Sequence, residues 1–83
     1  MTVIELTKLR KRMGLSQADM ATGMGMDLLA YQGVEAGEGL IRRRDELAAE
    51  RWVLAVAVEK GDPSLMPAKL REDVDEIAAR LRR

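Results

Sequence analysis

The segment from Ser16 to Gly37 constrains the fold of this chain more than any other feature. It reads SQADMATGMGMDLLAYQGVEAG and contains two residues that favour helix starts, Ser16 and Asp27. Side-chain oxygens of serine and aspartate accept hydrogen bonds from the first backbone N–H groups of a helix. Gly25 and Gly37 favour the left-handed conformation in which helices commonly end. The segment therefore predicts two short helices, near residues 16–24 and 27–36, joined by a tight turn at Gly25.

Two short helices joined in this way form a helix-turn-helix unit, and the rest of the chain also has helical periodicity. The stretch VLAVAV could form a strand on β-propensity, but the uninterrupted RRRDELAAER before it favours a helix. Residues GDPSLMP then interrupt the chain, and Pro67 suits the first position of a last helix. We predict an all-α fold, a compact five-helix domain without a sheet, with helices near residues 2–13, 16–24, 27–36, 42–60 and 67–82.

The composition excludes several classes of function. The 83 residues include no cysteine and no histidine, which removes thiol chemistry, disulfides and the usual zinc ligands. Ser16 and Ser64 have no base partner in the sequence, and no glycine-rich segment has the lysine of a phosphate-binding loop. We therefore expect a protein that is not an enzyme and that needs no cofactor and no metal.

The hydrophobic pattern argues against a membrane protein. The first residues, MTVIELTKLRKRMG, carry charges every few positions, unlike a signal peptide. The longest apolar run, WVLAVAV, is far too short to span a bilayer. We expect a cytoplasmic protein with no membrane partner.

The charges are balanced overall but unevenly distributed. The chain has 14 basic and 14 acidic residues, whereas a nucleic-acid-binding protein usually has a basic excess. The basic residues form two clusters, one from Lys8 to Arg12 and one from Arg42 to Arg44. Between them, residues 13–41 contain no lysine or arginine, and their only charges are acidic. The overall balance argues mildly against nucleic acid, but the two clusters could contact phosphates.

The sequence LRKRMGLSQADMATGMGMDLLAYQGVEAGE resembles the phage-repressor-like (Xre/Cro) helix-turn-helix family. The shared marks are a basic first helix ending in Gly-Leu-Ser-Gln, Ala21, the turn at Gly25, apolar residues at 31 and 34, and Glu35 with Gly37 closing the third helix. The resemblance covers about residues 5–58. It implies a helical domain that binds double-stranded DNA, acts as a dimer on two half-sites and regulates transcription, here by repression.

The resemblance also implies which residues contact DNA. The helix at 27–36 would enter the major groove and place Leu28, Leu29 and Gln32 against base edges. Gln17 would meet the phosphate backbone and brace that helix. The other expected phosphate contacts are Gly39, Arg42, Arg43, Lys11 and Arg12. On this basis residues 1–60 are the DNA-binding domain, and residues 61–83 are a C-terminal helix for packing or dimerisation.

Two of these positions depart from the family pattern and open an alternative. Leu28 and Leu29 stand where family members commonly have polar or basic side chains, and leucine can touch a thymine methyl but cannot hydrogen-bond to a base. Gln32 can make a bidentate contact, typically to adenine, or can simply be a solvated helix residue. Because Tyr31 and Val34 already face inward, at least one leucine should be exposed. The alternative function is a protein-interaction module, an antitoxin or adaptor, that uses Leu28 and Leu29 on a protein partner.

A second apolar surface suggests self-association. Leucine, valine and isoleucine recur at heptad-like spacing along the last helix, and the preceding helix is apolar nearly all round through residues 52–58. This is more apolar surface than a small monomer usually leaves in water, unless the two helices cover each other. We expect a homodimer that uses part of this set, with the remainder in the core: Trp52, Val56, Leu70, Val74, Ile77 and Leu81.

Overall fold

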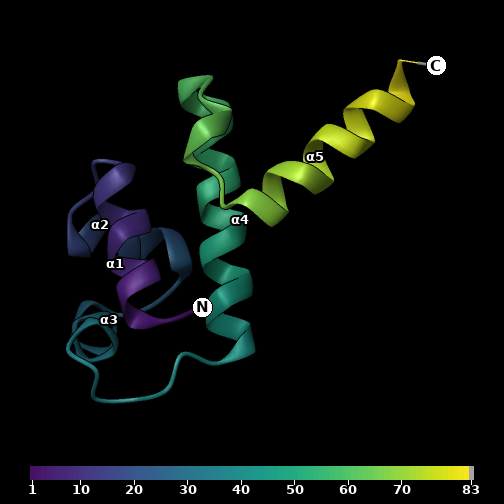
Figure 1. Cartoon of the computed structure of the whole chain (residues 1–83). Helices are drawn as coiled ribbons and strands as arrows, with labels where there is room; N and C mark the ends of the chain where they lie inside the picture. Colours follow the sequence, from purple (N-terminus) through teal and green to yellow (C-terminus); the bar gives the residue numbers. More distant parts are fainter. Residues whose placement is uncertain (83) are drawn as a thin grey trace.

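The computed structural model describes residues 1–82, and all of its regular secondary structure in that range is helical (Figure 1). Its elements are α1 (Val3–Arg12), α2 (Gln17–Met24), α3 (Leu28–Glu35), α4 (Arg43–Lys60), a 3₁₀ turn η1 (Pro63–Leu65) and α5 (Ala68–Leu81). The all-α, five-helix expectation is confirmed. VLAVAV lies inside α4, and no strand occurs in residues 1–82. The 3₁₀ turn was not predicted from the sequence. It lies in the segment GDPSLMP, which was predicted only to interrupt the helices.

The helix ends largely follow the capping residues of the sequence. Ser16 caps α2, because its hydroxyl accepts a hydrogen bond from the backbone N–H of Asp19 at 3.0 Å. Gly25 ends α2 with a φ of 73°, the left-handed conformation expected at the turn. Asp27 occupies the N-cap position of α3, but its exposed carboxylate makes no capping bond. Pro67 is the N-cap residue of α5 rather than its first helical residue.

The core lies between α4 and the three helices that precede it, which gather on one side of α4 (Figure 1). α4 turns Ala49, Val53, Val56 and Ala57 into this core, because these residues follow one another at helical spacing along one face. The other members are apolar side chains of α1–α3 and of the segment after α4: Leu6, Leu9, Met13, Met20, Ala21, Met24, Tyr31, Leu65 and Met66.

A close contact between α2 and α4 explains a glycine inside a helix. Gly23 lies directly beneath the indole of Trp52, and a Cβ at this position would overlap the ring atoms. Glycine in a helix costs about 1 kcal/mol relative to alanine. Here the absence of a side chain lets the largest residue of α4 pack flat on the backbone of α2. The glycine therefore has a packing role that outweighs its helix propensity.

α5 leaves the core and extends away from the other helices (Figure 1). The described chain measures 46 × 22 × 19 Å along its principal axes, and α5 has no buried residue. Leu70 and Val74 are half-buried against the core, whereas Ile77 and Leu81 are exposed. Within the described residues, no helix has the length and apolar character needed to cross a membrane.

Candidate nucleic-acid interface

The outer face of α3 is mostly apolar. Tyr31 is fully buried and Val34 is half-buried, so these residues hold the inner face of α3 against the core. Leu28, Leu29 and Gln32 all lie on the exposed side, and Leu29 is 78% exposed. Both leucines are therefore available to a partner. Gln32 is the one hydrogen-bonding side chain among the three expected groove-facing residues.

Gln32 is held in place by a chain of hydrogen bonds that ends in a part-buried ion pair. Its amide Nε2 donates to Oε1 of Gln17 at 3.2 Å, and Nε2 of Gln17 donates to Oε1 of Glu35 at 3.2 Å. Glu35 in turn accepts two bonds from Arg10, from Nε at 2.6 Å and from Nη2 at 3.0 Å. This bidentate arrangement is the geometry in which arginine and carboxylate interact most strongly. This series of hydrogen bonds links α1, α2 and α3. It anchors the exposed amide of Gln32 to the interior of the domain.

The ion pair at the base of this chain is largely removed from water. The side chains of Arg10 and Glu35 are 13% and 8% exposed. Burial alone would raise the pKa of Glu35, but hydrogen bonds from Arg10 and Gln17 outweigh it and hold that pKa below its usual value. The hydrogen bond to Glu35 raises the pKa of Arg10. Arg10 also donates from Nη1 to the carbonyl of Leu15 at 3.0 Å, which ties the end of α1 to the start of α2.

Three arginines lie at the start of α4, next to the helix-turn-helix. Arg42 is exposed in the loop before α4, and Arg43 and Arg44 have exposed side chains in the first turn of the helix. Arg43 pairs with Glu46 at 3.1 Å, an exposed contact that contributes at most about 1 kcal/mol and can exchange for a phosphate. Arg44 lines a shallow pocket of about 340 Å³ together with Asp27 at the start of α3. The beginnings of α3 and α4 therefore border one surface.

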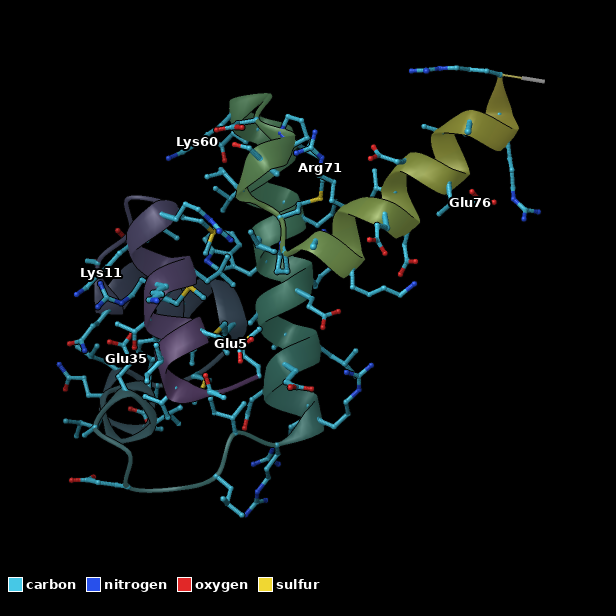
Figure 2. All side chains as sticks on the ribbon, in the orientation of Figure 1. Glu5, Lys11, Glu35, Lys60, Arg71 and Glu76 are labelled. Atoms are coloured by element: carbon cyan, nitrogen blue, oxygen red, sulfur yellow. The ribbon has the colours of Figure 1, made fainter. Side chains whose placement is uncertain are left out.

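The other expected phosphate contacts differ in how accessible they are. Gly39 is exposed in the loop between α3 and α4, and Figure 1 shows this loop at the same end of the molecule as α3. Lys11 is exposed on α1, and Figure 2 shows its side chain extending outward. The guanidinium of Arg12, by contrast, donates to the carbonyl of Leu65 at 3.1 Å. Arg12 thus joins α1 to η1, and this contact limits its reach toward a phosphate.

The six residues expected at a dimer interface or in the core separate into three groups. Val56 is buried in the core, and Trp52 is half-buried on Gly23. Leu70 and Val74 are half-buried where α5 begins, and Ile77 and Leu81 are 60% and 81% exposed on α5. The first group therefore packs within the chain. Ile77 and Leu81, the exposed half of the heptad-like stripe, remain accessible to a partner.

Sequence reading missed two features of this surface. It treated Arg10 only as a member of the basic cluster from Lys8 to Arg12, although Arg10 follows Leu6 by four residues on the same inward-facing stripe of α1. That spacing was the signal for its burial. It also gave no role to Leu40, which is 87% exposed in the loop after α3.

No protein-family model, curated protein or solved structure matches this chain.

Proposed function

We propose that this protein is a sequence-specific, double-stranded DNA-binding regulator of transcription, a dimeric repressor of the phage-repressor-like kind. In this proposal α3 enters the major groove. Arg42, Arg43, Lys11 and the backbone at Gly39 contact phosphates, which supply affinity, and the exposed face of α3 supplies discrimination between sequences.

The observation that carries the proposal is the hydrogen-bonded chain from the Arg10–Glu35 ion pair through Gln17 to Gln32. The contact with Gln17 uses one N–H of the Gln32 amide. It leaves the second N–H and the carbonyl oxygen for the N7 and N6 groups of adenine, the pair that glutamine reads in the major groove. An amide already held in one orientation loses less conformational freedom on binding. Such an anchored amide on an otherwise apolar exposed face suits the reading of one base pair.

The leucines next to Gln32 would add a weaker preference. Leu28 and Leu29 can contact the C5-methyl group of thymine, the one apolar group in the major groove. With a single hydrogen-bonding side chain on this face, we expect modest specificity, supplemented by DNA shape at positions that the protein does not touch.

Selection from randomised duplexes tests this function. The wild-type protein should enrich a site containing at least one fixed A·T pair, and Gln32→Ala should relax that one position with a cost of about 1–3 kcal/mol. Thr22→Ala, an exposed change on α2 outside the proposed contacts, is the control and should enrich the wild-type site. If Gln32→Ala and the double change Leu28→Ala with Leu29→Ala both enrich the wild-type site, α3 does not read DNA.

The exposed apolar surface favours a second function, a protein-interaction module that acts as an antitoxin or adaptor. Leu28 and Leu29 are 40% and 78% exposed and present apolar surface to solvent. A protein partner would cover them and gain from removing apolar surface from water. Under this alternative, Leu29→Ser abolishes a protein complex, and no duplex is bound in a salt-dependent way. The two functions can also coexist in one protein.

A further inference from the structure

α5 has an apolar stripe that its own chain covers only in part. Leu70, Val74, Ile77 and Leu81 lie within about 60° of one another around the helix, because successive residues are about 100° apart. Leu70 and Val74 touch the core, whereas Ile77 and Leu81 lie on the part of α5 that projects from it (Figure 1). The stripe therefore continues into solvent.

The covered end of the stripe opens into an apolar groove. The groove has a volume of about 280 Å³ and lies between the C-terminal half of α4 and the start of α5. Leu54 and Val58 of α4, Met66 and Val74 are among the residues that line it, and Val58 is 74% exposed. Because Val74 belongs to both the groove and the stripe, the two form one continuous apolar surface.

We propose that this surface binds a second copy of the chain, with the two α5 helices antiparallel. In that arrangement Leu70 packs on the second copy's Leu81, and Val74 packs on the second copy's Ile77. The two-fold axis passes near residues 75–76, and the second copy's Leu81 lies at the mouth of the groove. Each copy thereby covers the part of the stripe that the other leaves exposed, as a self-complementary two-fold contact requires.

The charges beside the stripe favour the antiparallel orientation. Asp73 and Arg80 lie seven residues apart on the same flank of α5, and Arg71 and Ala78 lie on the other flank. In an antiparallel pair like flanks face each other, so Asp73 of each copy lies near Arg80 of the other. In a parallel pair unlike flanks meet, and Asp73 would face Ala78. Within one chain Asp73 pairs with Lys69 and Arg80 with Glu76, both exposed contacts that can exchange.

This inference identifies the surface through which the dimer of the proposed function forms. It rests on the proposed function only in that two copies of the chain assemble about a two-fold axis. The end of α5 and the loop after α3 lie at opposite ends of the molecule (Figure 1). Pairing through α5 therefore leaves α3 uncovered in both copies. Its test needs no DNA, so self-association and DNA binding can fail separately.

Sedimentation equilibrium of the full chain tests the surface. The wild-type protein should dimerise below high micromolar concentration, and Ile77→Glu should weaken dimerisation about 100-fold or more, because the dimer buries this side chain twice. Ile4→Glu is the matched control, since Ile4 is a similarly exposed isoleucine on α1 and its replacement should leave the dimer intact. A monomeric wild-type protein, or equal effects of the two changes, would overturn the proposal.

Charge reversal tests the orientation. Asp73→Arg and Arg80→Asp should each weaken dimerisation on the order of tenfold, because each replaces two attractions with two repulsions. The double variant with both changes should recover the wild-type affinity, although both changes are unfavourable next to Lys69 and Glu76 within the helix. Helix content from circular dichroism confirms that α5 remains folded. A double variant that dimerises no better than the single variants would show that the helices are not antiparallel in this register.

Discussion

The part-buried Arg10–Glu35 ion pair beneath the proposed reading face gives the sharpest test of the structure. Arg10→Met keeps a long apolar stem in the same place but removes every donor to Glu35. The carboxylate, whose side chain is 8% exposed, then loses its charged partner while it remains largely out of water. Removing one partner of a buried pair costs about 3–5 kcal/mol, and because Arg10 is still 13% exposed we expect the lower end, about 3 kcal/mol. For a domain of this size, that corresponds to a fall in Tm of roughly 12–24 °C.

The effect of Arg10→Met should depend on pH in a defined direction. The wild-type pKa of Glu35 is lowered, so its contribution to stability is present above the ordinary glutamate pKa and is lost as the pH falls through the lowered value. In Arg10→Met, burial without the guanidinium raises the pKa of Glu35, and the variant gains stability relative to neutral pH when this group is protonated. The difference between the two proteins should therefore be largest near pH 7 and should shrink on acidification.

Urea unfolding at several pH values, followed by circular dichroism and by Trp52 fluorescence, measures both quantities. Lys69→Met is the control, because it removes the exposed Lys69–Asp73 pair and should cost no more than about 0.5 kcal/mol. Arg10→Met combined with Glu35→Leu removes both charges and should recover most of the stability. A loss below about 1 kcal/mol for Arg10→Met, or a difference that does not change with pH, would refute the ion pair as a buried anchor.

Three further changes probe other parts of the structure. Gly23→Ala should displace the Trp52 ring and lower the free energy of unfolding by about 1–3 kcal/mol. The indole emission should shift to longer wavelength, and unchanged fluorescence would contradict the packing of α2 on α4. Arg42→Ala should weaken binding to every duplex equally and flatten the salt dependence by about one unit, whereas Arg51→Ala, at an exposed position of α4 outside the proposed contacts, should leave that dependence alone. Leu29→Ser should leave stability within about 0.5 kcal/mol because the side chain is exposed, so any loss of a DNA or protein complex in a pull-down reports on contact.

Local chemistry explains what could be predicted from the sequence. The turn at Gly25, the Ser16 cap and the inward position of Tyr31 each depend on residues within one or two helical turns. The same local periodicity exposes Leu28 and Leu29 once Tyr31 faces the core. Short-range rules therefore determine the helix-turn-helix geometry and the exposed side of α3.

Contacts between distant segments explain what could not be predicted. The position of Arg10 on a buried stripe was visible, but its partner Glu35 lies 25 residues away, and nothing in the local pattern pairs them. The packing of Trp52 on Gly23 likewise joins two helices that a single sequence does not align. The direction of α5 depends on a few contacts in the segment after α4. The sequence therefore predicts the apolar stripe of α5 but not how much of that stripe the rest of the chain covers.

The salt dependence of DNA binding by the wild-type protein tests the central proposal most directly. Each phosphate contact releases counterions, so the logarithm of the binding constant should fall linearly with the logarithm of the salt concentration, by about 0.9 per contact. With Arg42, Arg43 and Lys11 as the contacting side chains in each copy of a dimer, six contacts in all, we expect a slope of about −5. We also expect tighter binding to a selected duplex than to a random one at every salt concentration. Binding without a salt dependence, or no binding to either duplex at low salt, would contradict the proposal that this protein reads DNA.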